Sequence, residues 1–241
     1  MSPPEDGVIE LRQYLLHPGR RDELIELFER EFIETQEAHG MAVMGQFHDL
    51  DAPDRFVWLR GFRDMAHRAA GLAAFYGGPV WQAHRDAANA TMIDSDNVLL
   101  LRPAWLGAGI DMRNRTRVGL ASPALPRGLL DASVFHLNRP APPALLRFCR
   151  NVISPVLARG GAQVLGWYVT EPAPNDFPRL PVREGETVLV GLAWFDGMAA
   201  FEAFTRSGAW AREVQPTLAC WLAGPTESLR LQPTARSALH A

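Results

Sequence analysis

The amino-acid sequence predicts an α+β fold made of two copies of one β-α-β-β-α-β unit, and an internal repeat is the main observation behind this. Residues 40–47 align with residues 161–168 at a shift of 121 positions, and residues 60–65 align with residues 193–198 at a shift of 133. The difference, 133 − 121 = 12, places twelve extra residues in the second copy, in the Pro-rich stretch 171–186. A repeat of this length indicates that each copy is one structural unit.

In the first copy, stretches with apolar residues at every second position alternate with stretches of helical spacing. The strand near 8–16 alternates polar and apolar side chains, as a half-buried strand does. One face of the following helix is apolar at the spacing of a helix that packs on a sheet, through Leu24, Leu27, Phe28 and Phe32. The expected elements are strands at 8–16, 41–49, 55–62 and 97–102, and helices at 20–39 and 64–91.

The second copy repeats this order. Its expected elements are strands at 132–138, 162–170, 187–195 and 228–232, and helices at 142–159 and 197–222. We therefore expect a first unit at 1–104 and a second, divergent unit at 131–241. The stretch 105–130 is rich in Gly, Pro, Arg and Ser and is expected to link them.

The β-α-β-β-α-β order is the ferredoxin-like arrangement, an antiparallel sheet with both helices on one face. The other face of each sheet needs a cover. Two units in one chain can cover each other by packing sheet to sheet, with side chains of both copies lining the space between them. The sequence thus predicts an intramolecular dimeric α/β-barrel, a pseudo-dimeric monomer for which further homodimerisation stays open.

The amino-acid composition excludes several classes of binding partner and of chemistry. The chain has 241 residues, 47% of them hydrophobic, with a net charge of −3 and no apolar run of eighteen residues, which argues against nucleic acid and membrane partners. All 24 basic residues are Arg, so chemistry that needs a Lys amine is excluded. Residues 1–6 lack the features of a secretion signal, so we expect a cytoplasmic protein.

Three stretches resemble the NIPSNAP family over roughly residues 8–104. They are Ile9-Glu-Leu-Arg-Gln-Tyr-Leu-Leu-His-Pro-Gly19, Val43-Met-Gly-Gln-Phe47 and Trp58-Leu-Arg-Gly-Phe-Arg-Asp-Met-Ala-His-Arg-Ala-Ala70. The resemblance implies the dimeric α/β-barrel fold, in a family whose members have diverse roles. Related barrel families include cofactor-free cyclases and isomerases, small monooxygenases and haem-binding enzymes.

The first strand carries the strongest candidates for chemistry. Glu10, Arg12 and Tyr14 share one face, and the opposite face is apolar. We expect the apolar face to meet the helices and the polar face to point into the barrel. Glu10 would then be an acid or base, with Arg12 to stabilise negative charge. The structural alternative is a Glu–Arg pair that is satisfied inside the barrel.

Two more strands extend this candidate site. Arg60 would be a second cation and His48 a second acid or base, although His48 also fits an exposed loop end. The expected substrate-binding residues could equally be ordinary core, and they are Gln46, Trp58, Phe62, Phe135 and Trp167. The matched positions of the second copy hold Asp131, Ser133 and Phe135 on its first strand and Gly191, Ala193 and Phe195 on its third. They predict an apolar wall, and hence one polar pocket per chain.

We therefore expect a small-molecule enzyme of bacterial specialised or catabolic metabolism, with an anionic or aromatic ligand inside the barrel. Its acid/base chemistry would be cofactor-independent, and cyclisation, isomerisation, lyase chemistry and oxygenation all stay open. A non-catalytic ligand-binding or interaction protein is the alternative. Haem binding is a third reading, for which His67 or His84 would be the axial ligand. No spacing of His, Cys or acidic residues predicts a metal site.

Overall fold

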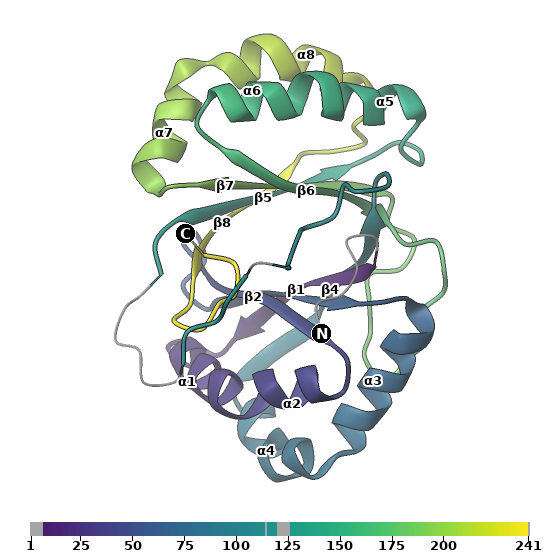
Figure 1. Ribbon diagram of the computed structural model, residues 1–241, viewed down its shortest axis with the longest axis vertical. Helices are drawn as coiled ribbons and strands as arrows, with labels where there is room; N and C mark the ends of the chain where they lie inside the picture. Colours follow the sequence, from purple (N-terminus) through teal and green to yellow (C-terminus); the bar gives the residue numbers. More distant parts are fainter. Residues whose placement is uncertain (1–6, 114, 120–125, 241) are drawn as a thin grey trace.

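The computed structural model describes residues 7–113, 115–119 and 126–240 (Figure 1). Residues 1–6, on which the expectation of no secretion signal was based, lie outside the described residues. The same holds for residues 114 and 120–125 of the expected linker, and for residue 241.

The element order is β-α-β-β-α-β twice over. The strands are β1 (Val8–Leu16), β2 (Ala42–Asp49), β3 (Arg55–Phe62), β4 (Met92–Pro103), β5 (Leu129–His136), β6 (Gln163–Thr170), β7 (Val188–Phe195) and β8 (Glu227–Pro233). The α-helices are α1 (Arg21–Leu27), α2 (Ile33–Ala38), α3 (Met65–Gly77), α4 (Pro79–Asn89), α5 (Pro143–Phe148), α6 (Ser154–Arg159), α7 (Met198–Ser207) and α8 (Gln215–Leu218). Three π-helical segments and one 3₁₀ segment interrupt them: η1 (Phe28–Phe32), η2 (Cys149–Ile153), η3 (Trp210–Val214) and η4 (Ala219–Trp221).

The eight strands form one closed antiparallel barrel in the order β1-β3-β2-β8-β5-β7-β6-β4. Each half contributes four adjacent strands, and the pairs β2·β8 and β4·β6 join the halves. Helices α1–α4 cover the outer face of the first half, and α5–α8 cover the opposite side (Figure 1). The predicted fold of two ferredoxin-like units closed into one barrel is confirmed. No helix among the described residues has the length and apolarity that crossing a membrane requires.

All four expected helices are divided: π-helical segments interrupt those expected at 20–39, 142–159 and 197–222, and the helix expected at 64–91 is broken at Gly78. The helix expected at 64–91 ends before Gly78, whose backbone is extended (φ −82°, ψ 164°), and restarts at Pro79. A residue that precedes proline is driven out of the helical region, which explains the break. The helix expected at 20–39 continues through the π-helical segment η1.

The barrel interior is filled with apolar side chains from both halves. Ile9 and Leu11 of β1 belong to the same core cluster as Leu130 and Val134 of β5. The expected orientation of β1 is therefore wrong, because its apolar face lines the barrel. Glu10, Arg12 and Tyr14 instead face the helices, where their polar partners lie, so the expected pocket inside the barrel does not contain them.

The same helix-facing layer holds the expected substrate-binding residues. Trp58 and Phe62 lie in the core between β3 and the first-half helices. Phe135 and Trp167 lie in the matching core of the second half. These aromatic side chains are thus sheet-to-helix core, the ordinary structural role that the sequence left open.

Candidate functional site

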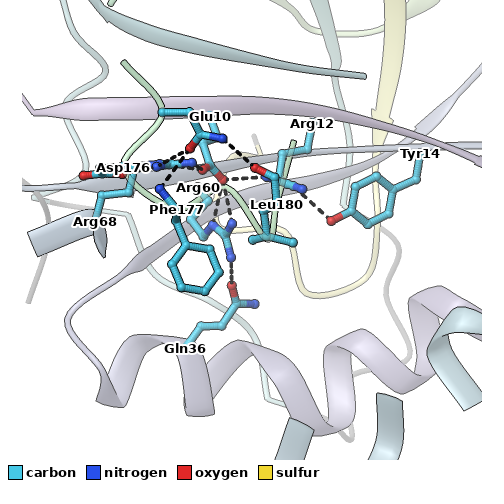
Figure 2. A network of polar contacts seen from close by, with 10 residues as sticks. Glu10, Arg12, Tyr14, Gln36, Arg60, Arg68, Asp176, Phe177 and Leu180 are labelled. Atoms are coloured by element: carbon cyan, nitrogen blue, oxygen red, sulfur yellow. Dashed lines mark hydrogen bonds and ion pairs between the residues drawn. The ribbon is translucent and has the colours of Figure 1, made fainter. Parts of the chain in front are cut away.

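Glu10 is the centre of a buried ionic cluster between the first-half sheet and its helices (Figure 2). Its side chain is fully buried. Oε2 accepts hydrogen bonds from Arg12 Nη1 at 2.9 Å and from Arg60 Nε and Nη2 at 3.0 and 2.6 Å. Oε1 accepts one from Arg68 Nε at 2.8 Å. Three guanidiniums therefore surround one carboxylate, and we call Glu10, Arg12, Arg60 and Arg68 the Glu10 cluster.

Strand pairing and one helix explain why these four side chains meet. Glu10 and Arg60 are direct partners in the β1·β3 register, and Arg12 follows on the same face of β1. Arg68 belongs to the first turns of α3, which packs on this face. From α2, Gln36 Oε1 accepts a hydrogen bond from Arg60 Nη1 at 2.9 Å. The cluster thus ties two strands to two helices.

The positive charges of three neighbouring arginines keep Glu10 ionised. Burial alone would raise the pKa of this carboxyl, but Arg60, Arg12 and Arg68 together hold it well below its usual range. Both carboxylate oxygens are already occupied by guanidinium donors. A carboxylate that stays ionised and has both oxygens occupied can hold the three arginines in position. It is poorly placed to act as an acid or base.

The stretch 171–186 of the second half, which contains its twelve extra residues, contacts the Glu10 cluster, and Figure 2 shows Asp176 beside Arg68. Asp176 pairs with Arg68, and Asn175 Oδ1 accepts a hydrogen bond from Arg68 Nη1 at 3.1 Å. The Phe177 ring stacks on Tyr76 of α3 with 6.1 Å between centroids. This segment, which we call the cap segment, therefore completes the first half with residues of the second.

Two aromatic rings enclose the arginines. The Arg60 guanidinium lies 4.9 Å from the Trp58 ring centroid and 5.4 Å from that of Phe62. Such contacts stabilise a buried cation. Gln46 pairs with Trp58 in the β2·β3 register and is also buried. Within the described part of the chain, the side-chain amide of Gln46 and the indole nitrogen of Trp58 have no hydrogen-bond partner.

Tyr14 connects the Glu10 cluster to a cavity. Its hydroxyl accepts a hydrogen bond from Arg12 Nε at 2.9 Å. Beside it lies a cavity of about 440 Å³, the Tyr14 pocket, which is lined by Tyr14, Tyr76, Trp81, Arg85, Asp86, Asn89, Met92, Ser95, Phe177, Arg179 and Leu180. Burial raises the pKa of Tyr14 although the nearby Arg12 opposes this, so the phenol keeps its proton near neutral pH.

The expected histidines lie away from this arrangement. His48 is near the start of α1, with 3.9 Å between its Nδ1 and Asp22 Oδ1. His67 pairs with Asp64 at the N-terminus of α3, and His84 lies 3.6 Å from Glu31. Within residues 7–113, 115–119 and 126–240, no three His, Cys, Asp or Glu side chains are grouped to hold a metal ion.

The second half contains a residue that the sequence analysis did not select as a candidate, Asp131. It lies on β5, on the face that meets the helices, at the edge of a cavity of about 350 Å³. Burial raises the pKa of this carboxyl to about 6, although Ser228, Ser133 and Arg230 oppose the shift. The available signal is a lone aspartate in an otherwise apolar strand pattern, and the predicted apolar wall takes no account of it.

The comparisons with known proteins support the fold. A "putative monooxygenase" from Lactobacillus acidophilus aligns over 96% of this chain and 97% of its own, with 11% identity and a TM-score of 0.56. Another from Fusobacterium nucleatum aligns over 97% and 94%, with 6% identity and a TM-score of 0.56. An anthrone oxidase-like protein aligns over 100% and 98%, with 14% identity and a TM-score of 0.52. No curated protein matches the chain.

The sequence of the first half matches a family as well. The matching family model is NIPSNAP, and it covers residues 9–106. This region includes β1 to β4, the four arginine and glutamate residues of the Glu10 cluster and most of the Tyr14 pocket. In sequence, the first half of the chain is therefore similar to the NIPSNAP family.

Proposed function

We propose that the protein binds an anionic aromatic small molecule in the Tyr14 pocket and acts on it by acid/base chemistry, without a cofactor. The observation that carries this proposal is the position of Tyr14, which belongs both to the hydrogen-bond network of the Glu10 cluster and to the wall of the cavity. The ligand would enter between the sheet and the helices of the first half.

The walls of the pocket suit such a ligand. Tyr76, Trp81 and Phe177 offer aromatic surface, and Arg179 offers a guanidinium with no ion-pair partner among the described residues. Arg85, in contrast, is 3.4 Å from Asp86 and is largely balanced by it. One uncommitted cation beside three rings favours an aromatic ring with a carboxylate or phenolate.

Tyr14 would supply the proton. The lone pair of its oxygen is engaged by Arg12 Nε, so its O–H is available to donate to a ligand oxygen. The guanidinium behind the phenol would also stabilise negative charge on that ligand oxygen, as when solvent hydroxide takes the C–H proton next to a ketone and leaves an enolate and water. Oxygenation of an enolisable aromatic ketone is one reaction of this kind, and structures described as an anthrone oxidase-like protein and a putative monooxygenase share the fold.

A non-catalytic ligand-binding role is the second candidate. It is favoured by the saturation of Glu10, whose oxygens are held by three arginines and are not free to accept a proton from a ligand. Binding and turnover must therefore be measured separately.

The test is titration calorimetry with 2-hydroxybenzoate as the anionic aromatic probe. Tyr14→Phe should weaken binding about tenfold or more, because a hydrogen bond to a charged group contributes about 1.5–3 kcal/mol. Tyr168→Phe is the matched control, since its hydroxyl accepts a hydrogen bond from the Ile110 amide far from this pocket. Equal affinity of Tyr14→Phe and wild type would reject the proposed site.

Catalysis has its own readout. With anthrone as an enolisable ketone, oxygen uptake above the uncatalysed rate and its loss in Tyr14→Phe would support an enzyme. Tight binding of 2-hydroxybenzoate together with no oxygen uptake and no exchange of the acidic C–H protons of anthrone with D₂O would favour the binding protein. A Soret band after hemin addition would instead favour the haem reading.

A further inference from the structure

The second half contains a cavity lined mainly by apolar side chains, together with several hydroxyls and one carboxylate. It lies between the sheet and α7 with η3, and its volume is about 350 Å³. Asp131 and Ser133 of β5 contribute polar atoms. The rings of four aromatic residues surround them, namely Phe135, Phe201, Phe204 and Trp210. We call this the Asp131 cavity.

The same place in the first half is filled by the Glu10 cluster. Glu10 pairs with Arg60 in the β1·β3 register, and Asp131 pairs with Ala193 in the β5·β7 register, at shifts of 121 and 133. Along the helix, the shift of 133 that aligns the starts of α3 and α7 matches Arg68 to Phe201. The second half has therefore kept an acidic side chain and lost the guanidiniums that neutralise its counterpart.

The groups that face Asp131 leave its charge uncompensated. Oγ atoms of Ser133 and Ser228 donate to its carboxylate at 3.4 Å each, which is long for hydrogen bonds. Arg230 is its register partner on β8. However, the Arg230 guanidinium is paired with Asp51, with 2.7 Å between Nε and Oδ2. No ion pair to Asp131 occurs among the residues that the structure describes.

Among the described residues that line the cavity, the helices contribute no cation. The α7 and η3 residues that line it are apolar or neutral, Phe201, Phe204, Thr205, Gly208, Trp210 and Ala211. Beyond this lining, Glu202 of α7 acts on Arg230 and pairs with Arg206. Arg212 of η3 lies beside Gly208, and its guanidinium donates to the Ser207 carbonyl at 2.8 Å. A half-buried carboxylate beside aromatic rings, with no ion-pair partner among the described residues, fits a ligand that brings a cation.

We propose that the Asp131 cavity binds the cation of a primary arylalkylamine, with the ammonium on the Asp131 carboxylate and the aromatic ring against Phe201, Phe204 and Trp210. This site and its ligand class are separate from the anionic ligand proposed for the Tyr14 pocket. The carboxylate supplies a charge-assisted hydrogen bond, and the rings supply apolar contact and cation–π attraction.

The probe is 2-phenylethylamine, and binding is measured by calorimetry at about pH 8. Asp131→Asn should weaken binding about 10- to 100-fold, the range expected for loss of a charge-assisted hydrogen bond. Asp196→Asn is the matched control, because it removes the same charge from an exposed residue outside the cavity. The neutral isostere 2-phenylethanol should bind at least tenfold more weakly than the amine.

A second variant and the pH dependence keep the test decisive if Asp131→Asn fails to fold. Ala211→Trp fills the cavity from its exposed side and should block the amine while Asp131 remains. In wild type, binding should weaken as the pH falls from about 8 to about 5, because the pKa of Asp131 is about 6 and its protonated form has no charge. Neither the Ala211→Trp substitution nor this fall in pH should alter the affinity of the Tyr14 pocket for 2-hydroxybenzoate.

Three results would overturn the proposal. They are no detectable binding of the amine to wild type at millimolar concentration, equal affinity of the amine for Asp131→Asn and wild type, and equal affinity of the amine and the alcohol. Loss of amine binding together with intact 2-hydroxybenzoate binding in Asp131→Asn would support this site independently of the first.

Discussion

The same conservative substitution should have opposite effects on stability at two matched strand positions. Glu10→Gln and Asp131→Asn each replace a carboxylate by an amide of nearly the same shape, on the helix-facing side of β1 and β5. Glu10 is surrounded by three guanidiniums, whereas Asp131 has only two long contacts from hydroxyls. The sign of each change follows from this difference.

Glu10→Gln should destabilise the folded protein strongly. The change removes the charge that compensates Arg12, Arg60 and Arg68, and leaves Asp176 as the remaining acidic partner of Arg68. Removing one partner of a buried ion pair costs about 3–5 kcal/mol. For a chain of this size that corresponds to a drop in Tm of about 6–20 °C. Because the pKa of Glu10 is held low, this loss should persist from pH 7.5 down to pH 5.

Asp131→Asn should stabilise the protein near neutral pH. Burial raises the pKa of this carboxyl from 3.8 to about 6, so its stabilising contribution is complete below pH 3.8 and is lost as the pH rises through 6. A shift of about two units corresponds to about 3 kcal/mol, and partial solvent access reduces this to about 1–2 kcal/mol. The gain should be seen at pH 7.5 and should shrink at pH 5.

Urea unfolding followed by circular dichroism measures both effects, on wild type and the two variants at both pH values. The control is Asp196→Asn, whose exposed side chain should change the free energy of unfolding by less than about 0.5 kcal/mol. The reasoning is refuted if the two variants shift stability in the same direction at pH 7.5, or if the Asp131→Asn gain grows as the pH falls.

Three further predictions follow from close contacts and exposure. Gly191→Ala should cost about 1–3 kcal/mol in urea unfolding, because its Cβ would lie 2.7 Å from the Trp167 ring; an unchanged midpoint would contradict this packing. One thiol should react with Ellman's reagent in the folded protein and two after unfolding, since Cys220 is exposed and burial raises the pKa of Cys149 to about 12; two fast-reacting thiols would be inconsistent with this. Asp176→Asn should speed tryptic cleavage after the exposed Arg179, because it weakens the link from the cap segment to Arg68, and cleavage at the wild-type rate would show that the ion pair does not hold the segment.

The sequence is sufficient to predict the order of strands and helices. It is insufficient to predict which face of β1 points into the barrel. The strands and helical regions lie near their predicted places because most carry a periodic pattern of their own, although β4 begins at Met92 rather than at 97. Alternation along β1 also separated Glu10, Arg12 and Tyr14 from the apolar residues. This alternation does not identify the inward face, because both faces of β1 are buried, one in the barrel and the other under the helices. Residues distant in sequence decided the orientation, above all Arg68 on α3.

The cap segment and Asp131 show the same limit. Twelve extra residues could be located from the repeat, but their contact with Arg68 depends on how the two halves pack. Likewise, Asp131 was visible beside Ser133, and only the loss of neighbouring guanidiniums in space distinguishes its surroundings from those of Glu10. Patterns along the chain predict elements, whereas the chemistry here depends on contacts between them.

The pairs β2·β8 and β4·β6 close the ring of strands within one polypeptide. Closure is therefore a unimolecular event, whose equilibrium does not depend on protein concentration, unlike that of a barrel assembled from two separate chains. In the closed ring, each of the described strands has a neighbour on both sides, whereas an unpaired edge is the usual template for strand-to-strand aggregation. Dilution should leave this barrel intact, and a proteolytic cut that released one half would expose four edge strands at once.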